Sequence, residues 1–223
     1  MYQLIKRFFD FLAALILLLL LSPLLLPIAL ILKLTAEGEV FYFQKRIGQH
    51  NRPFFIWKFA TMLKNSPNMG SGTITLRRDP RVTGPGHFLR KTKINELPQI
   101  INVLTGDMSL VGPRPLDERG FNAYSDAIRA VIYNARPGIT GIGSIVFRDE
   151  ERLLSRPGID PKAFYAHHIA PYKGALELWY LQNQSFATDL KLLLLTAWVV
   201  VFPDAELVYR VFPGLPEKPE VLR

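Results

Sequence analysis

Glu96 is the carboxylate of this chain best placed for chemistry with phosphate, because it stands at the start of a predicted helix. Apolar residues spaced at i, i+3, i+4 and i+7 predict an amphipathic helix over residues 96–104: Leu97, Ile100, Ile101 and Leu104. Gly106 is expected to end this helix. Free N–H groups at a helix N-terminus attract phosphate. Glu96 is therefore a candidate ligand of Mg²⁺, which bridges phosphate oxygens with one or two carboxylates.

Asn95 precedes Glu96 and has two predicted roles. As a structural residue, it is well suited to the N-cap of the helix. As a functional residue, it offers a neutral oxygen ligand beside the carboxylate. Three nearby cations strengthen the attraction for phosphate: Arg90, Lys91 and Lys93.

Arg114 lies in the short segment Gly112-Pro113-Arg114-Pro115. A proline on each side restricts the backbone, so the guanidinium is presented rigidly. A fixed guanidinium suits bidentate phosphate binding. An ordinary proline-bounded turn is the structural alternative.

Positive charge is concentrated in one part of the chain. The net charge is +8, yet residues 44–94 hold eleven Lys/Arg and one acid, Asp79, for a net +10. Such a segment seeks nucleic acid, lipid headgroups or phosphorylated substrates, or it forms a solvated surface. The chain has no cysteine, which excludes disulfides, thiol nucleophiles and cysteine metal sites.

The N-terminal run from Phe8 to Leu34 predicts a membrane anchor. It is longer than the apolar core of a signal peptide and lacks a small-residue cleavage site, so it is expected to remain on the protein. Ser22-Pro23 interrupts the run, and cations flank both ends. Cations on both sides favour placing both ends in the cytoplasm. A re-entrant helix-break-helix and a kinked membrane span both remain open on these grounds.

The rest of the chain predicts a small α+β fold. Aromatic runs within 39–63 predict a β-hairpin, and 64–86 predicts a loop. Residues 117–134 and 161–182 are predicted helices. The apolar segment 190–202 is too short to span a membrane, so a buried helix and an interfacial helix are the alternatives.

The chain resembles the bacterial sugar transferases, the monotopic phosphoglycosyl transferases. The segments that carry this resemblance extend almost from end to end: KRFFD at 6–10, SP at 22–23, FQKRIG at 43–48, KFATM at 58–62, DPRVT at 79–83, FLRKT at 88–92, NELPQIINVLTGDMSLVGPRP at 95–115, RPGITG at 136–141 and DLKLL at 189–193. The ungapped block over 88–115 makes the resemblance specific.

The resemblance implies a re-entrant anchor over residues 1–36, broken at Ser22 and Pro23, and a cytoplasmic catalytic domain over 37–223. It implies a monotopic protein on the cytoplasmic face of the bacterial inner membrane. Such enzymes use Mg²⁺ and transfer a sugar 1-phosphate from a nucleotide sugar, usually a UDP-sugar, to polyprenol phosphate. They release a nucleoside monophosphate and begin surface glycan assembly. A second copy of the chain is a further candidate partner.

Two positions depart from the family pattern. Asn95 stands where the family has a nucleophilic aspartate, and Ala60 stands where it has an arginine. We hypothesise that the two changes are linked, because loss of one charge leaves a partner charge unpaired. The segment GIGSIVFRDEE after residue 141 also differs, so donor specificity is expected to differ.

An amide oxygen is a poor nucleophile towards phosphorus, so three interpretations of position 95 remain. Glu96 takes the nucleophile role, or the acceptor phosphate attacks the donor directly with Asn95 and Glu96 as metal or phosphate ligands. In the third interpretation Asn95 marks an inactive form, either engineered or a natural assembly protein that binds prenyl phosphate.

Further residues are predicted to contact substrate. Lys58, Arg81 and Arg114 are predicted phosphate ligands, and Arg148 and Asp189 are additional candidates. His167 and His168 are adjacent, so they diverge on a helix and are expected at the surface. A membrane-tethered nucleic-acid binder is a rival class, but no known reader motif supports it, and no nucleic-acid partner is expected.

Overall fold

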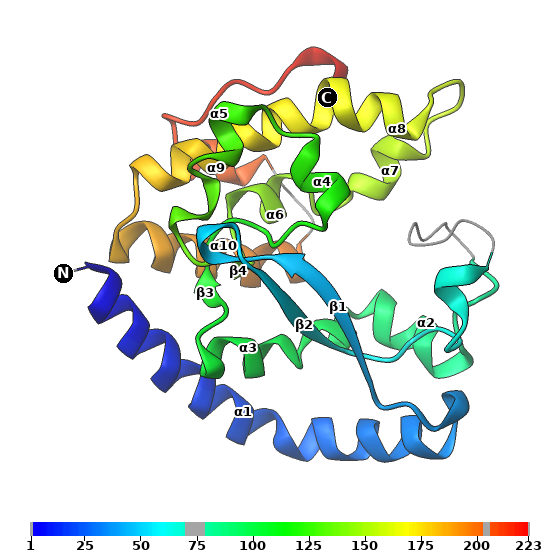
Figure 1. Cartoon of the computed structure of the whole chain (residues 1–223). Coiled ribbons are helices and arrows are strands. Elements are labelled where there is room, and N and C mark those ends of the chain that lie inside the picture. Colours follow the sequence, from blue (N-terminus) through cyan, green and yellow to red (C-terminus); the bar gives the residue numbers. More distant parts are fainter. Residues whose placement is uncertain (1, 70–78, 203–205, 223) are drawn as a thin grey trace. The chain divides into compact units, whose positions relative to one another are not determined.

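The computed structural model describes residues 2–69, 79–202 and 206–222, and it has the predicted mixed α+β composition (Figure 1). The chain forms two compact units. The first unit comprises Met1–Phe8, Arg46–Phe54 and Asp107–Arg223, and the second comprises Phe9–Lys45 and Phe55–Gly106.

Helix α1 (Tyr2–Leu34) is the long apolar helix that the sequence predicts. In the described parts of the chain it alone is long and apolar enough to cross a membrane, judged by length and composition. The helix runs through Ser22 and Pro23, so these residues do not separate two helices. Figure 1 shows its axis changing direction part-way along, as prolines inside a helix cause by removing a backbone donor. Re-entrant insertion itself stays a prediction.

The C-terminal part of α1 contributes to the core of the second unit. Ile28 and Leu32 pack with Phe59 and Leu89 in one buried cluster. Most other apolar side chains of α1 are exposed. Only a narrow stripe of α1 is therefore used for packing, which leaves a wide apolar surface.

Strands β1 (Phe41–Ile47) and β2 (Pro53–Phe59) form the predicted hairpin. The N–H of Gly48 donates to the carbonyl of Arg52 at 2.8 Å and closes the turn. The ring of Trp57 meets Phe41 and Phe43 edge to face. These cross-strand aromatic contacts stabilise the pairing, which explains the density of aromatic residues in this segment.

The region around Asn95 differs from the single helix that was predicted. Helix α2 (Gly84–Lys91) is followed by a 3₁₀ turn, η4 (Ile94–Glu96), and then by α3 (Gln99–Thr105). Pro98 has no N–H to donate to the preceding turn, so the α-helix begins only after it. Asn95 therefore lies inside η4, and its predicted role as N-cap is wrong. Gly106 ends α3 in the left-handed conformation, as predicted.

The predicted loop over 64–86 is shorter than expected at its C-terminal end, where α2 begins at Gly84. Thr83 caps α2 by accepting a hydrogen bond from Gly86 N at 3.2 Å. The described part of the loop holds a short 3₁₀ turn, η3 (Ser66–Asn68). Residues 70–78 of this prediction lie outside the described residues.

Asn102 attaches α3 to strand β2. Its Oδ1 accepts from the N–H of Trp57 at 2.9 Å, and its Nδ2 donates to the carbonyl of Phe55 at 2.8 Å. The amide therefore pairs with both backbone groups, as a neighbouring strand would. This fixes the position of α3 along β2.

In the first unit, β3 (Ser109–Val111) and β4 (Gly138–Thr140) pair in parallel, with Ser109 opposite Gly138. Backbones approach closely just beyond β3. A Cβ added to Gly138 would lie 2.1 Å from Gly112 N, and one added to Gly141 would lie 2.2 Å from Gly112 O. Only glycine fits at these two positions.

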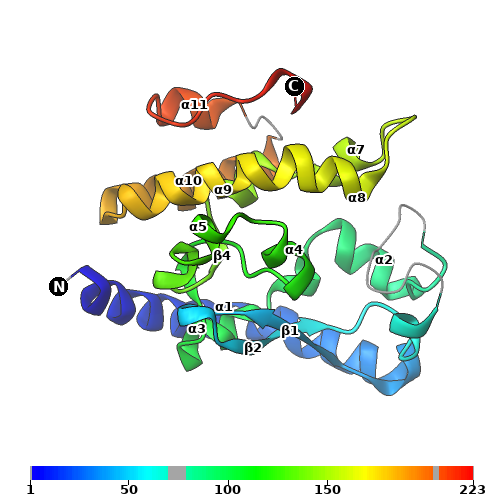
Figure 2. The ribbon, with the colours of Figure 1, turned by 45° about the horizontal axis from the view of Figure 1, so that its top comes forward.

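The helices of the first unit surround one large apolar core. Predicted helical residues 117–134 form three short pieces, α4 (Glu118–Asn122), α5 (Asp126–Arg129) and η5 (Ile132–Asn134). The prediction over 161–182 is confirmed as α8 (Pro161–Phe164), the π-turn η6 (Tyr165–Ile169) and α9 (Ala170–Gln182), which run as one rod (Figure 2). The remaining helices of this unit are α6 (Ile142–Val146), α7 (Glu150–Leu154), α10 (Phe186–Val201), α11 (Leu207–Val211), and the short 3₁₀ turns η2 (Gln49–Asn51) and η7 (Glu220–Leu222). The 3₁₀ turn η1 (Ala36–Gly38) belongs to the second unit.

Helix α10 combines the two alternatives foreseen for the apolar C-terminal segment. Leu192, Leu195 and Val199 are buried in the core of the first unit. Leu194 and Val201 on the same helix are more than 60% exposed. One face of α10 is therefore packed, and the other is an uncovered apolar surface.

We expect Asn102→Ala to lower the free energy of unfolding by roughly 2 kcal/mol, because two backbone groups of β2 lose their partner. Thermal unfolding in detergent measures this change. Asn183→Ala is the control, since the exposed Asn183 side chain donates only to the carbonyl of Trp179 on its own helix among the described contacts, and the substitution leaves the backbone carbonyl that accepts from Thr188 in place. Equal midpoints for the two variants would contradict the role of Asn102.

Candidate functional site

The centre of the candidate site in the second unit is an ion pair between β2 and η4. Lys58 Nζ lies 3.1 Å from Glu96 Oε1. The two side chains are 15% and 25% exposed, so the pair is shielded yet open to solvent on one side. Lys58 directly follows Trp57, whose N–H is bonded to Asn102. The attachment of α3 to β2 therefore also brings η4 within reach of Lys58.

Asn95 lies next to this pair and is 8% exposed. Its Oδ1 is buried and has no hydrogen-bond partner within residues 2–69, 79–202 and 206–222. An unsatisfied buried acceptor is costly, so proteins seldom retain one without a functional reason. Lys93, two residues before Asn95, adopts the left-handed conformation with φ of 61°. Such strain clusters at functional sites.

These residues fit a Mg²⁺ ion. Mg²⁺ is usually held by one or two carboxylates together with water and substrate phosphates, rather than by a cage of protein ligands. The Glu96 carboxylate and the Asn95 amide oxygen supply two oxygen ligands on one turn. Among the described residues no group of three or more His, Cys, Asp and Glu side chains is arranged to hold a metal.

Arg81 does not resemble a free phosphate ligand. Its side chain is 3% exposed and forms a bidentate pair with Asp79, at 2.8 Å from Nε and 2.5 Å from Nη2. Nη1 donates to the carbonyls of Ser66 and Met69. These contacts join residues 79–81 to the backbone at Ser66 and Met69, so the described geometry gives Arg81 a structural role.

Arg114 belongs to the first unit and is exposed on a fixed backbone. Its carbonyl accepts from the hydroxyl of Tyr133 at 2.9 Å. The same hydroxyl accepts from the N–H of Leu116 at 2.9 Å. The predicted rigid presentation of Arg114 is therefore supported by named contacts on its C-terminal side.

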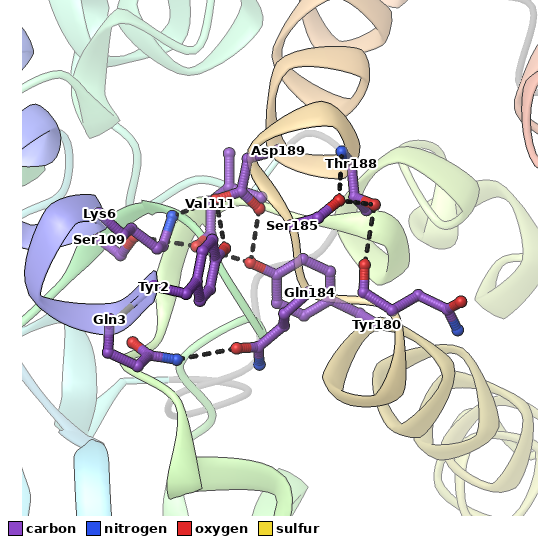
Figure 3. Close-up of polar contacts among 11 residues, drawn as sticks. Tyr2, Gln3, Lys6, Ser109, Val111, Tyr180, Gln184, Ser185, Thr188 and Asp189 are labelled. Carbon is purple, nitrogen blue, oxygen red and sulfur yellow. Dashed lines mark hydrogen bonds and ion pairs between the residues drawn. The ribbon is translucent and has the colours of Figure 1, made fainter.

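Asp189 is the centre of a buried polar cluster and not an open binding residue (Figure 3). Its Oδ2 accepts from Lys6 Nζ at 2.6 Å and from the hydroxyl of Tyr2 at 2.7 Å. Its Oδ1 accepts from the hydroxyl of Tyr180 at 2.8 Å. Asp189 thus ties the start of α1 to α10 and α9. Burial and the neighbouring Asp189 raise the pKa of Tyr180, which keeps its hydroxyl proton in place.

The remaining candidates lie at the periphery. Arg148 donates to the carbonyl of Val200 at 3.5 Å, at the end of α10. His167 and His168 are exposed on the π-turn η6, as predicted for surface residues. The predicted link between Ala60 and Asn95 stays a prediction. Ala60 is buried, and its N–H donates to Val40 O at 2.9 Å.

Two charged residues of α9 were missed by sequence reasoning. Lys173 and Glu177 are both buried, although they stand one turn apart on a helix that looked ordinary. Lys173 pairs with Glu150 of α7. The backbone N–H of Arg114 donates to the carboxyl group of Glu177. Charges inside the otherwise apolar pattern of 170–182 were the signal that could have drawn attention to them.

Burial raises the pKa of Glu177 from its ordinary value of 4.5 to about 8, despite the opposing effects of the Arg114 N–H and of Lys173. At neutral pH the group is therefore mostly protonated. Burial also lowers the pKa of Lys173, which Glu150 partly offsets.

The long exposed apolar helix α1 suggests membrane association, judged by its length and composition. The model of the family described as "Bacterial sugar transferase" matches residues 1–203. The chain belongs to this bacterial sugar transferase family, as the sequence motifs predicted.

Curated relatives agree with this family. The chain is 36% identical over 200 residues to the exopolysaccharide production protein ExoY of Rhizobium meliloti, covering 83% of the chain and 80% of the relative. It is 37% identical over 199 residues to the UDP-glucose:undecaprenyl-phosphate glucose-1-phosphate transferase of Escherichia coli, covering 88% and 40%. It is 44% identical over 147 residues to the UDP-N-acetylgalactosamine-undecaprenyl-phosphate N-acetylgalactosaminephosphotransferase of Aeromonas hydrophila, covering 65% and 34%. The chain therefore spans well under half the length of the last two relatives.

We expect Lys6→Met to destabilise the protein by about 3 kcal/mol, since it leaves the buried carboxylate of Asp189 without its cation. In the double variant Lys6→Met/Asp189→Asn the loss should be smaller than the sum of the two single losses, because both charges are gone. Thermal unfolding of the four proteins in one detergent measures the coupling. Lys64→Met, which breaks the exposed pair with Glu39, should leave the midpoint nearly unchanged. Additive losses would contradict the proposed coupling.

Glu177→Gln is expected to stabilise the protein at pH 7 and above. The folded protein binds this proton more tightly than the unfolded chain does, so stability falls as pH rises from 4.5 towards 8. Replacing the acid removes this loss, which is on the order of 1–3 kcal/mol at pH 7. Unfolding midpoints from pH 4.5 to pH 9 measure the effect. A gain that is the same at pH 4.5 and pH 8 would contradict the raised pKa.

Proposed function

We propose that the protein transfers a sugar 1-phosphate from a UDP-sugar to a polyprenol phosphate. The products are a polyprenyl diphosphate-sugar and uridine monophosphate. This would be the first membrane step in assembly of a surface polysaccharide. The observation that carries the proposal is the Lys58–Glu96 pair beside the unpartnered Asn95 oxygen, within the region that matches the family.

The names of the relatives support the choice of substrates. The relatives from Escherichia coli and Aeromonas hydrophila are named for transfer from a UDP-sugar to undecaprenyl phosphate. ExoY is named for exopolysaccharide production. Undecaprenyl phosphate is therefore the acceptor to use in an assay. The names of the relatives do not determine which donor sugar this chain uses.

In this proposal, the residues of η4 and β2 bind the reacting phosphates. Glu96 and the Asn95 oxygen would hold Mg²⁺, which would supply positive charge to the phosphate oxygens. Lys58 orients the Glu96 carboxylate through their 3.1 Å contact. Arg114, in the other unit, is a separate candidate phosphate ligand, whose guanidinium offers two parallel N–H donors. Arg81 and Asp189 are assigned no substrate contact, because their described contacts hold the fold together.

We propose a direct transfer rather than a covalent intermediate on residue 95. An oxygen of the polyprenol phosphate attacks the β-phosphorus of the UDP-sugar, and a new P–O bond forms. The bond from the β-phosphorus to the bridging oxygen breaks, and uridine monophosphate leaves with the electron pair. The amide oxygen of Asn95 takes no part as nucleophile, because it would have to form a bond that an aspartate forms far more readily.

The membrane supplies the acceptor in this proposal. The exposed apolar surface of α1 would lie in the bilayer of the bacterial inner membrane, with Lys6 and Lys33 near its two ends. Both cations are expected on the cytoplasmic side, which a re-entrant α1 permits. The uncovered face of α10 is suited to the interface of the same membrane. Residues 1–36 would thus serve as the anchor, and 37–223 as the cytoplasmic catalytic domain.

We predict that the purified protein in nanodiscs releases uridine monophosphate from a UDP-sugar only when undecaprenyl phosphate and Mg²⁺ are present. Intact mass after incubation with donor and Mg²⁺ alone should show no adduct. Glu96→Gln is expected to lower turnover by about 10²-fold or more, since a charge that positions the reacting phosphates is lost. Trials with several UDP-sugars identify the donor.

Glu39→Gln provides the matched control, because Glu39 forms an ion pair with Lys64 in the same unit and lies outside the proposed site. Its turnover should equal that of the unaltered protein. A phosphosugar adduct on Glu96 would contradict direct transfer but keep the overall reaction. Binding of undecaprenyl phosphate with no turnover for any donor would support the alternative of an inactive assembly protein.

A further inference from the structure

Glu177 is a buried acid that the proposed reaction does not use. Glu177 lies on α9 and is only 2% exposed, so substrate cannot reach its side chain. Its Oε2 has no hydrogen-bond partner in the described parts of the chain. Burying a polar oxygen without a partner costs stability. Stability alone therefore does not explain a polar side chain at this position.

The carboxyl group of Glu177 lies against the backbone of Arg114 and of Gly143. The N–H of Arg114 donates to its carboxyl group. Its Oε1 packs directly on Gly143, where an added Cβ would lie 2.4 Å from this oxygen. The first turn of α6 thus has no side chain at the point where the carboxyl group reaches the Arg114 backbone.

The other backbone groups of the turn are held by different partners. Gly112 N donates to Thr140 O at 2.9 Å, and Gly138 N donates to Pro113 O at 2.9 Å. On the far side, the hydroxyl of Tyr133 donates to Arg114 O. Glu177 supplies the acceptor for the Arg114 N–H, so the peptide groups on both sides of the Arg114 Cα are fixed.

Lys173 fixes the helix that carries Glu177. It is buried one turn earlier on α9, where it pairs with Glu150 and lies over the rings of Phe147 and Tyr165. An attachment of this kind restricts sliding or rotation of α9 relative to the turn. The position of the Glu177 carboxyl group is therefore determined by the attachment of α9 through Lys173 as well as by the Glu177 rotamer.

We propose that Glu177 is a positioning residue for the reaction: by binding the Arg114 N–H from the buried side, it sets the direction in which the Arg114 guanidinium meets the donor phosphate. This inference rests on the proposed role of Arg114 in phosphate binding. Glu177 touches no substrate, so its whole effect passes through Arg114.

The test compares Glu177→Gln, Glu177→Asp and Glu177→Met, each alone and combined with Arg114→Ala, in nanodiscs. The dissociation constant for uridine diphosphate, measured by titration calorimetry, and the KM and kcat for the donor are the readouts. Glu177→Met and Glu177→Asp should weaken binding and raise KM about 10-fold, since neither side chain reaches the Arg114 N–H as glutamate does. Glu177→Gln keeps the acceptor and should restore both values to within about threefold.

The Arg114→Ala background separates positioning from a general structural role. There, Glu177→Asp and Glu177→Met should change the dissociation constant less than twofold, although their unfolding midpoints shift as they do in the single variants. Equal losses in both backgrounds would overturn the proposal. Folded single variants whose uridine diphosphate binding and KM are unchanged would also overturn the proposal. If Glu177→Met does not fold, Glu177→Asp alone serves for this comparison.

The same measurements separate this proposal from the one it rests on. If Arg114→Ala itself leaves uridine diphosphate binding and KM unchanged, the phosphate role of Arg114 fails, and the role of Glu177 fails with it. If Arg114→Ala weakens binding but the Glu177 variants do not, only the positioning role is overturned.

Discussion

A polar group that leaves water must find a hydrogen-bond partner inside the protein, and this requirement fixes key side chains within each of the two units. The amide of Asn102 pairs with two backbone groups of β2 and so sets η4 beside Lys58. Tyr133 and Glu177 pair with the two sides of Arg114. Asp189 gathers Lys6, Tyr2 and Tyr180. In each case a side chain satisfies atoms that are distant in the sequence, so these hydrogen bonds fix the relative positions of separate elements.

The unpartnered Oδ1 of Asn95 stands out against this rule. This oxygen is retained in a buried place without a partner among the described residues, whereas the Glu96 carboxylate beside it is paired with Lys58. Substituting amide for carboxylate keeps the shape and the acceptor but removes the charge and the nucleophilic strength. In the proposed reaction, such a site would bind phosphate and metal through geometry. The chemistry would then rest on the alignment of two substrates, as is common for phosphoryl transfer.

Local patterns predicted much of this structure. Aromatic alternation located the hairpin, apolar length located α1, and Gly106 located the end of α3. Other features depended on distant residues and could not be predicted in this way. Pro98 divided the predicted helix because a missing donor outweighed the apolar spacing. Arg81 and Asp189 were expected at substrate because they are charged, yet each is satisfied by buried partners that the local sequence does not reveal. Glu177 was missed for the same reason, since its partner lies 63 positions earlier at Arg114.

The contact between Lys6 and Asp189 joins residues 183 positions apart. During synthesis at roughly 5–20 residues per second, α1 leaves the ribosome about ten seconds or more before its carboxylate partner exists. The anchor must therefore enter the membrane and persist there with Lys6 still solvated or bound to lipid headgroups. Closure of this contact is then a late event in biogenesis. A chain that stops before α10 would have a membrane helix whose first turn lacks its contact with Asp189. Quality-control proteases would then encounter the helix without this contact.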